Sequence, residues 1–141
     1  MLSLRVLVVI LFLFFLTPCC LFGFCFEEAG ELYGISPLLL RAIAEVESGF
    51  NPHAINWNSG SYDYGLMQIN SSWAGVIGLS NWLMLGDPCF NVKVGAWVLR
   101  QCIERYGYSW EAVGCYNARS PEKRLNYINR VYRKLLELGW R

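Results

Sequence analysis

Three dipeptides that begin helices, Ser36-Pro37, Asp87-Pro88 and Ser120-Pro121, constrain the fold of this chain most. A short polar side chain caps a helix amino terminus, and proline fits the first turn, where its missing N–H would have no partner. Apolar residues at helical spacing follow each dipeptide. We therefore predict a helix after each one, and the first runs from Pro37 to about Ser48.

The apolar spacing also predicts which helix faces are buried. The long helix after Asp87-Pro88 ends at Gly107, and shorter helices are expected at 26–33, 73–79 and 110–116. Residues 49–65 are rich in Asn, Ser and Gly and predict a long loop or irregular hairpin, and 64–70 a short strand. The chain of 141 residues is thus one mainly α domain with a small β or loop element. The predicted inward positions of the three main helices are Leu39, Ile43 and Val46; Val92, Ala96, Leu99 and Ile103; and Leu125, Ile128, Tyr132 and Leu135.

The amino-terminal segment has the pattern of an export signal. Arg5 precedes an unbroken apolar run from Val6 to Leu16, which Thr17-Pro18 interrupts. We expect residues 1–24 to be a signal peptide, cleaved between 20 and 25, and residues 25–141 to be the mature domain. An uncleaved membrane anchor is the alternative.

Charge and cysteine content exclude several kinds of function. The 12 Lys and Arg balance 11 Asp and Glu, which argues against a nucleic-acid partner. Catalytic triads need a histidine, and His53, in the polar loop, is the only one. Beyond the signal, four cysteines remain without a Cys-x-x-Cys pair, so we expect structural disulfides, with three possible pairings, and no metal or cofactor.

Glu45 and Glu47 share a helix but not an environment. Glu45 follows Arg41 by one turn, which is the spacing of an exposed ion pair. Glu47 continues the apolar line of Leu40 and Ala44 at the helix end, where the polar loop begins. Partial burial raises the pKa of a carboxyl group, as a general acid requires, although a structural glutamate fits this position equally well.

Three ordered motifs resemble those of lytic transglycosylases with the goose-type lysozyme fold. They are Glu47-Ser48-Gly49-Phe50-Asn51-Pro52, Gly65-Leu66-Met67-Gln68-Ile69-Asn70 and Ala112-Val113-Gly114-Cys115-Tyr116-Asn117-Ala118. The resemblance implies an α+β lysozyme-like fold and an enzyme that cleaves peptidoglycan strands. The small size, the signal and Asp87-Pro88-Cys89 further resemble compact members that accompany bacterial secretion, conjugation and pilus machines, which implies a periplasmic location.

The resemblance also assigns roles to residues. Glu47 is implied to be the catalyst, and a phenol such as that of Tyr116 to orient it. Gly65 would let the backbone approach a sugar, Met67 would form an apolar wall, and Gln68 would bind an acetamido group. The implied substrate-binding set is Ser48, Gly65, Met67, Gln68, Tyr116 and Asn117.

The implied mechanism uses one acid. Glu47 protonates the glycosidic oxygen after N-acetylmuramic acid, and then acts as base on the C6 hydroxyl to give a 1,6-anhydro product. The alternatives are a hydrolytic muramidase in which Asp63 is the second carboxylate, and a non-catalytic peptidoglycan-binding assembly factor.

Aromatic residues and cysteines complete the predictions. Trp57, Tyr62 and Tyr64 are candidates for the substrate groove, since ring faces stack on sugars. For the disulfides we favour Cys25–Cys89, which would tie the first helix to the long helix, and Cys102–Cys115, which would join neighbouring helices. We expect a monomer whose partners are glycan strands and components of a secretion or conjugation machine.

Overall fold

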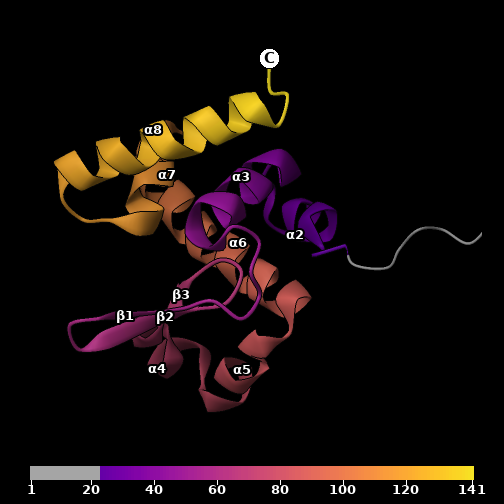
Figure 1. Cartoon of the computed structure of the whole chain (residues 1–141), viewed down its shortest axis with the longest axis vertical. Helices are drawn as coiled ribbons and strands as arrows, with labels where there is room; N and C mark the ends of the chain where they lie inside the picture. The colour runs from indigo at the N-terminus through magenta and orange to yellow at the C-terminus, as the bar shows by residue number, and fades with distance from the viewer. Residues whose placement is uncertain (1–22) are drawn as a thin grey trace, which may run out of the picture.

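The computed structural model describes residues 23–141, so all but the last two residues of the predicted signal peptide lie outside the described residues. Helices dominate, and one small sheet lies to one side of them (Figure 1). The mainly α fold with a small β element is therefore confirmed. The helices are α2 (Phe26–Tyr33), α3 (Pro37–Ser48), α4 (Ala74–Ile77), α5 (Leu79–Leu83), α6 (Pro88–Tyr106), α7 (Trp110–Asn117) and α8 (Pro121–Glu137), with 3₁₀ turns η1 (Ser71–Trp73) and η2 (Met84–Gly86).

Local sequence signals account for the helix ends. Proline occupies the first turn of α3, α6 and α8, as predicted. The Asp87 carboxylate accepts a hydrogen bond of 2.7 Å from the Phe90 N–H at the start of α6. The Ser36 side chain makes no such bond, and its backbone N–H instead donates to the Tyr108 hydroxyl. Gly49 ends α3 in the left-handed conformation, at φ 61°.

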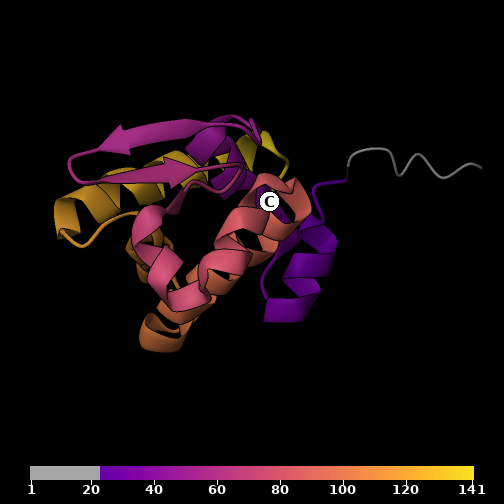
Figure 2. The same ribbon diagram turned by 90° about the horizontal axis from the view of Figure 1, so that it is seen from below.

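Helix α6 forms the centre of the molecule. It crosses between α2 on one side and α7 on the other (Figures 1 and 2). Its predicted stripe of Val92, Ala96, Leu99 and Ile103 is buried, together with Leu40 and Ile43 of α3. This core fixes the carboxyl end of α3, where Glu47 lies.

The predicted inward face of α8 is partly wrong. Leu125 and Tyr132 are 59% and 40% exposed, whereas Tyr127 and Val131 are buried beside the predicted Leu135. Tyr132 lies instead between Trp110 and Trp140, with ring centroids 5.6 and 6.0 Å away. This outer aromatic cluster accounts for the apolar character of position 132.

The polar stretch after α3 forms an antiparallel hairpin of β1 (Ile55–Asn58) and β2 (Ser61–Tyr64), to which β3 (Ile69–Asn70) adds. Asn56 pairs with Asp63, and Trp57 with Tyr62. Because side chains alternate along a strand, these two pairs face opposite sides of the sheet. The hairpin is one of the two forms predicted for this stretch. The single strand expected over 64–70 is divided, because Tyr64 ends β2, residues 65–68 form a turn and Ile69–Asn70 form β3.

The helix expected over 73–79 is interrupted. Gly78, at φ 84° and ψ 153°, separates α4 from α5, because this backbone conformation cannot continue a helix. The Asn70 side chain accepts a hydrogen bond from the Ser72 N–H at the start of η1.

The expected ion pair between Glu45 and Arg41 is also wrong. Glu45 pairs with Lys134 of α8 at 3.0 Å, and Arg41 pairs with Glu27 of α2. Tertiary packing brings these partners closer than the helical neighbour one turn away. Both pairs are solvent-accessible, so each contributes little to stability.

Two disulfides join distant parts of the chain. They connect Cys25 to Cys89 and Cys102 to Cys115, the two pairs that the sequence analysis favours. The first ties the start of α2 to the start of α6, and the second joins α6 to α7. None of the helices within residues 23–141 has the length and apolar character needed to cross a bilayer.

Candidate active site

A polar cleft of about 580 Å³ lies between the sheet and the α3, α7 and α8 helices. Glu47 from α3, Asp63 from β2, and Tyr116 and Asn117 from α7 line it. A separate apolar pocket of about 240 Å³, lined by residues such as Leu99 and Trp110, contains no carboxylate. Of these two pockets, only the polar cleft presents carboxyl groups.

Glu47 lies in an environment that favours its protonated form. Burial raises its pKa to about 7, and the negative charge of Asp63 adds to this effect. The Tyr127 hydroxyl donates a 2.6 Å hydrogen bond to Glu47 Oε1, and this bond and the positive charge of Arg130 act in the opposite direction. A carboxyl group with a pKa near 7 can both donate and accept a proton at neutral pH.

Asp63 is held as an acceptor on the sheet side of the cleft. Asn70 Nδ2 donates to its Oδ1, and Asn58 Nδ2 donates to its Oδ2, each at 2.7 Å. The strand register places Asp63 directly opposite Asn70, so adjacent strands fix the carboxylate. The cleft thus contains two carboxyl groups in different environments, one half-buried beside the Tyr127 phenol and one hydrogen-bonded to amides.

The segment 65–68 folds back beneath the cleft. Gly65 has a φ of 81°, and a β-carbon there would lie 2.2 Å from Asn91 Nδ2, so glycine is required for close packing against α6. Gln68, at φ 51°, is only 8% exposed. Its amide donates to the carbonyls of Ala54 and Gly65 and accepts from Asn56, so its hydrogen bonds hold the hairpin to the segment.

The structure brings together only part of the predicted substrate-binding set. Gln68, Tyr116 and Asn117 line the cleft with Glu47 and Asp63. Ser48, Gly65 and Met67 lie behind this lining: the Ser48 hydroxyl donates to the Leu66 carbonyl, and Met67 is fully buried. These three residues support the site from within the fold.

The phenol on Glu47 belongs to Tyr127, a residue that the sequence reasoning missed. The Tyr116 hydroxyl donates instead to the Met67 carbonyl at 2.7 Å. Tyr127, Val131 and Leu135 are spaced four residues apart and form a buried line on α8. This line is present in the sequence, but the competing positions Leu125 and Tyr132 concealed it.

All three aromatic groove candidates face away from Glu47. Trp57, Tyr62 and Tyr64 lie on the outer face of the hairpin, where they border a different groove with Trp82 of α5. The prediction that they line the cleft is wrong, because strand alternation places Asn58 and Asp63 on the cleft side.

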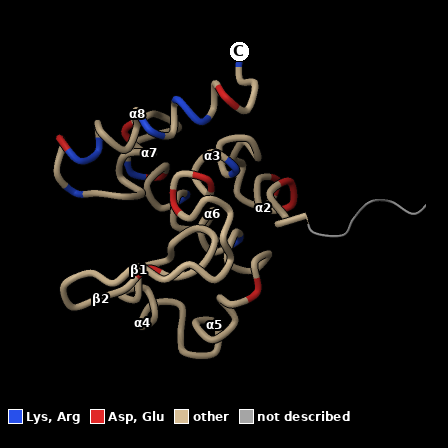
Figure 3. Tube along the Cα trace, in the orientation of Figure 1, with Lys and Arg blue, Asp and Glu red and all other residues tan. Residues whose placement is uncertain are grey.

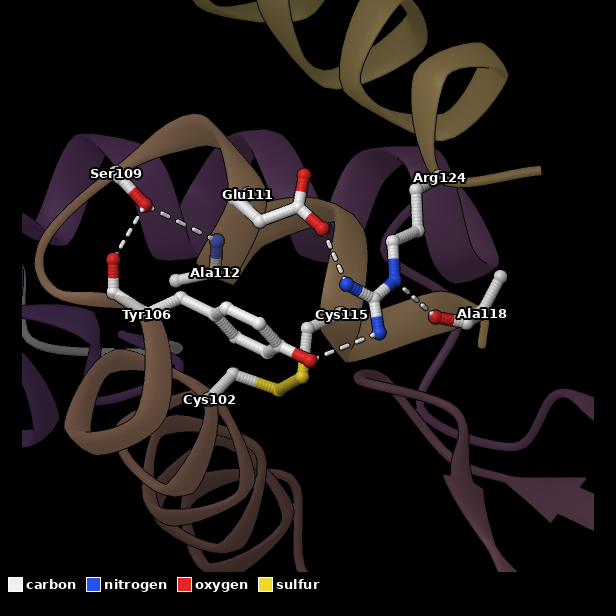
Figure 4. Close-up of polar contacts among 8 residues, drawn as sticks. All are labelled: Cys102, Tyr106, Ser109, Glu111, Ala112, Cys115, Ala118 and Arg124. Carbon is white, nitrogen blue, oxygen red and sulfur yellow. Dashed lines mark hydrogen bonds and ion pairs between the residues drawn. A yellow bond between two sulfur atoms is a disulfide. The ribbon is translucent and has the colours of Figure 1, made fainter. Parts of the chain in front are cut away.

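The junction of α7 and α8 is fixed by Arg124 (Figure 4). Its guanidinium donates to the Ala118 carbonyl and the Tyr106 hydroxyl, and pairs with Glu111. Beside it, the Cys102–Cys115 disulfide holds α7 against α6. These contacts fix Tyr116 at the cleft and direct α8 so that Tyr127 reaches Glu47.

One group of residues within 23–141 has the composition of a metal site. Cys25, Glu28 and Cys89 present ligand atoms within 4.8 Å of one another. Both sulfur atoms form the Cys25–Cys89 disulfide, so neither is a thiolate that could bind a metal.

Comparison with known proteins agrees with this geometry. The family model described as the transglycosylase SLT domain matches residues 24–135. The chain is 46% identical over 123 residues to "Protein IpgF" of Shigella flexneri, which covers 82% of this chain and 81% of that protein. It is 44% identical over 117 residues to "Invasion protein IagB" of Salmonella typhimurium (80% and 73%). It is also 36% identical over 123 residues to "Peptidoglycan-binding-like protein" of Escherichia coli O157:H7 (77% and 74%).

Proposed function

We propose that Glu47 is the catalytic acid of this chain, which belongs to the transglycosylase SLT family and is a peptidoglycan lytic transglycosylase. The observation that carries the proposal is the raised pKa of Glu47, about 7, in a polar cleft. The pKa of Glu27, by contrast, is lowered by its hydrogen bond from Arg41. Glu47 is thus the group best suited to give and take a proton at neutral pH.

The proposed reaction breaks the β-1,4 bond between N-acetylmuramic acid and N-acetylglucosamine. Glu47 donates its proton to the glycosidic oxygen, and the acetamide oxygen of the substrate stabilises the positive charge at C1. The Glu47 carboxylate then takes the proton of the C6 hydroxyl, whose oxygen bonds to C1. The products are a 1,6-anhydromuramic end and a free C4 hydroxyl, and Glu47 is protonated again without consuming water.

Substrate contacts are assigned to the residues that line the cleft. Asn117 is proposed to bind the sugar directly, since it is exposed at the end of α7. Gln68 and Tyr116 present their outer surfaces to the sugar while their hydrogen bonds hold the hairpin and the 65–68 segment. Ser48, Gly65 and Met67 are proposed to act by shaping this segment.

Hydrolysis is the second candidate, and the observation that favours it is the fixed carboxylate of Asp63. An ionised carboxylate in the same cleft as a protonated one can activate a water molecule. In that case Glu47 remains the acid, and the product is a reducing end.

Mass spectrometry of digested sacculi separates the two reactions. Anhydro ends, lighter than reducing ends by one water, are expected, and reducing ends alone would overturn the transglycosylase assignment. Glu47→Gln should lower kcat by about 10² or more, since general acid catalysis supplies about that factor. If the Gln variant folds and cleaves sacculi at the wild-type rate, Glu47 is not the acid.

The proposed setting is local opening of the cell wall during assembly of a secretion, conjugation or pilus apparatus. The relative named as an invasion protein supports such a setting. Export to the periplasm is supported by two disulfides, since such bonds persist in oxidising compartments. Fractionation of cells, with amino-terminal sequencing of the periplasmic protein, tests the location and the signal cleavage between 20 and 25.

A further inference from the structure

One end of the molecule has an uncharged surface. It consists of β1, α4, α5 and η2, which we call the apolar lobe, and it lies at the opposite end of the molecule from α8 (Figure 1). Between Glu47 and Asp87 the sequence contains a single acidic residue, Asp63, which lines the cleft, and no Lys or Arg. Figure 3 shows the contrast, since Lys and Arg are concentrated on α8 and absent from the described segments around β1, α4 and α5.

Large apolar side chains project from this lobe into solvent. Trp57 is 78% exposed, Leu83 74%, Leu79 70% and Val76 66%. Met84 is also more than half exposed. A group of neighbouring exposed apolar residues marks an interaction surface, because folding alone would favour polar residues there.

Aromatic rings join β1 to α5 within the lobe. The Trp57 ring centroid lies 5.0 Å from that of Tyr62, which lies 5.8 Å from that of Trp82. These rings border a groove of about 380 Å³ with Leu83. Rings with an apolar body and one polar tip suit the boundary between hydrocarbon and water.

We propose that the apolar lobe inserts into the surface of an electrically neutral lipid bilayer and holds the cleft beside a membrane. A lobe without charged side chains suits such a surface, because burying a charged side chain in the bilayer would be costly. Sugars would stack on the rings but leave the aliphatic side chains of Val76, Leu79 and Leu83 in water. Protein interfaces use charged groups to select and orient a partner, and β1, α4, α5 and η2 contain none.

Vesicle flotation tests the proposal with the full mature protein. Wild type should float with vesicles of pure phosphatidylcholine, and raising the salt concentration should leave the bound fraction unchanged. Leu79→Asp combined with Leu83→Asp should lower the partition coefficient about tenfold or more. Brominated phosphatidylcholine should quench tryptophan fluorescence of wild type, and less so that of Trp57→Phe.

Matched controls come from equally exposed leucines outside the lobe. Leu32→Asp and Leu125→Asp, at positions 62% and 59% exposed, should float like wild type. Circular dichroism verifies that each variant is folded, and cleavage of sacculi by the lobe variant should remain at the wild-type rate.

Three outcomes of the vesicle experiments would overturn the proposal. They are failure of wild type to bind neutral vesicles, binding that needs anionic phosphatidylglycerol and disappears in salt, and lobe variants that float like wild type. The proposal would also be overturned if wild type bound no vesicles and the lobe variant lost binding to sacculi, because that result would point to a glycan partner.

Discussion

At the scale of single residues, the site depends on a contact between Glu47 and Tyr127, which lie 80 positions apart in the sequence. The position of Glu47 at the end of an apolar helix line was predictable, because burial follows from the periodicity of α3 alone. Its partner was not, since α8 carries two apolar lines and only packing decides which one is buried. Tyr116 illustrates the same limit, because its motif indicates a role but not which oxygen it contacts.

Two substitutions beside Glu47 should shift the pH dependence of cleavage in opposite directions. Tyr127→Phe removes a hydrogen bond that favours the ionised form, so the pKa of Glu47 rises and activity persists to higher pH. Asp63→Asn removes a negative charge that disfavours ionisation, so the pKa falls and activity is lost at lower pH. Profiles of kcat/KM against pH measure both shifts; displacement in the same direction would contradict this description of the site.

Glu47 should also make folding stability depend on pH. Its pKa is about 7 in the folded chain against 4.5 ordinarily, so the unfolded state releases its proton first and stability falls between these values. The Gln side chain of Glu47→Gln cannot ionise, so this variant does not lose stability in the same way. Its free energy of unfolding relative to wild type should increase by up to roughly 3 kcal/mol between pH 4.5 and pH 8. Urea unfolding at the two pH values measures the gain, and a constant difference between the proteins would show that Glu47 has the same pKa in the folded and unfolded chains.

At the scale of elements, helices with strong end signals were predictable, and faces and short strands were not. The α3 and α6 bounds follow from Ser36-Pro37, Asp87-Pro88 and the glycines that end them. The region between them depends on tertiary contacts to Asn91, which accepts from the Met67 N–H and donates to the carbonyls of Tyr64 and Leu85. No local pattern in the sequence identifies such a side chain, because its partners are backbone groups far along the chain.

Asn91→Ala should therefore destabilise the fold. Asn91 is 1% exposed, and its loss removes the side-chain partner of the Met67 N–H and of the Tyr64 and Leu85 carbonyls, at a cost of roughly 2–4 kcal/mol. Asn81→Ala is the control, since this exposed side chain donates only to the Ile77 carbonyl and should change stability by about 0.5 kcal/mol or less. Equal effects of the two substitutions in urea unfolding would refute the proposed role of Asn91.

At the scale of the whole molecule, the cleft is closed on one side by the sheet and on the other by the carboxyl-terminal helices. Charge follows the same division, with cations on α8 and none on the described apolar lobe (Figure 3). Composition averaged over the chain conceals this polarity, since the net charge is only +1. The disulfides join α2 to α6 and α6 to α7, and neither of them reaches the sheet.

The two disulfides should contribute unequally to stability. Cys25 and Cys89 are 64 positions apart, and Cys102 and Cys115 only 13. The entropy lost by the unfolded chain on closing these loops predicts a contribution of about 4 kcal/mol for the first and about 3 kcal/mol for the second. Urea unfolding of the two paired Cys→Ala variants measures this order, and a larger loss for the shorter loop would contradict it.

The contact between α3 and α8 has a consequence for the time at which the enzyme becomes active. A ribosome makes Glu47 early and Tyr127 late, and a chain delivered amino end first reaches its destination in the same order. Until α8 has arrived, Glu47 lacks both its hydrogen-bond donor and part of the cover that keeps water from it. If Glu47 is the acid, as we propose, the environment that raises its pKa is complete only once α8 is in place, near the end of synthesis.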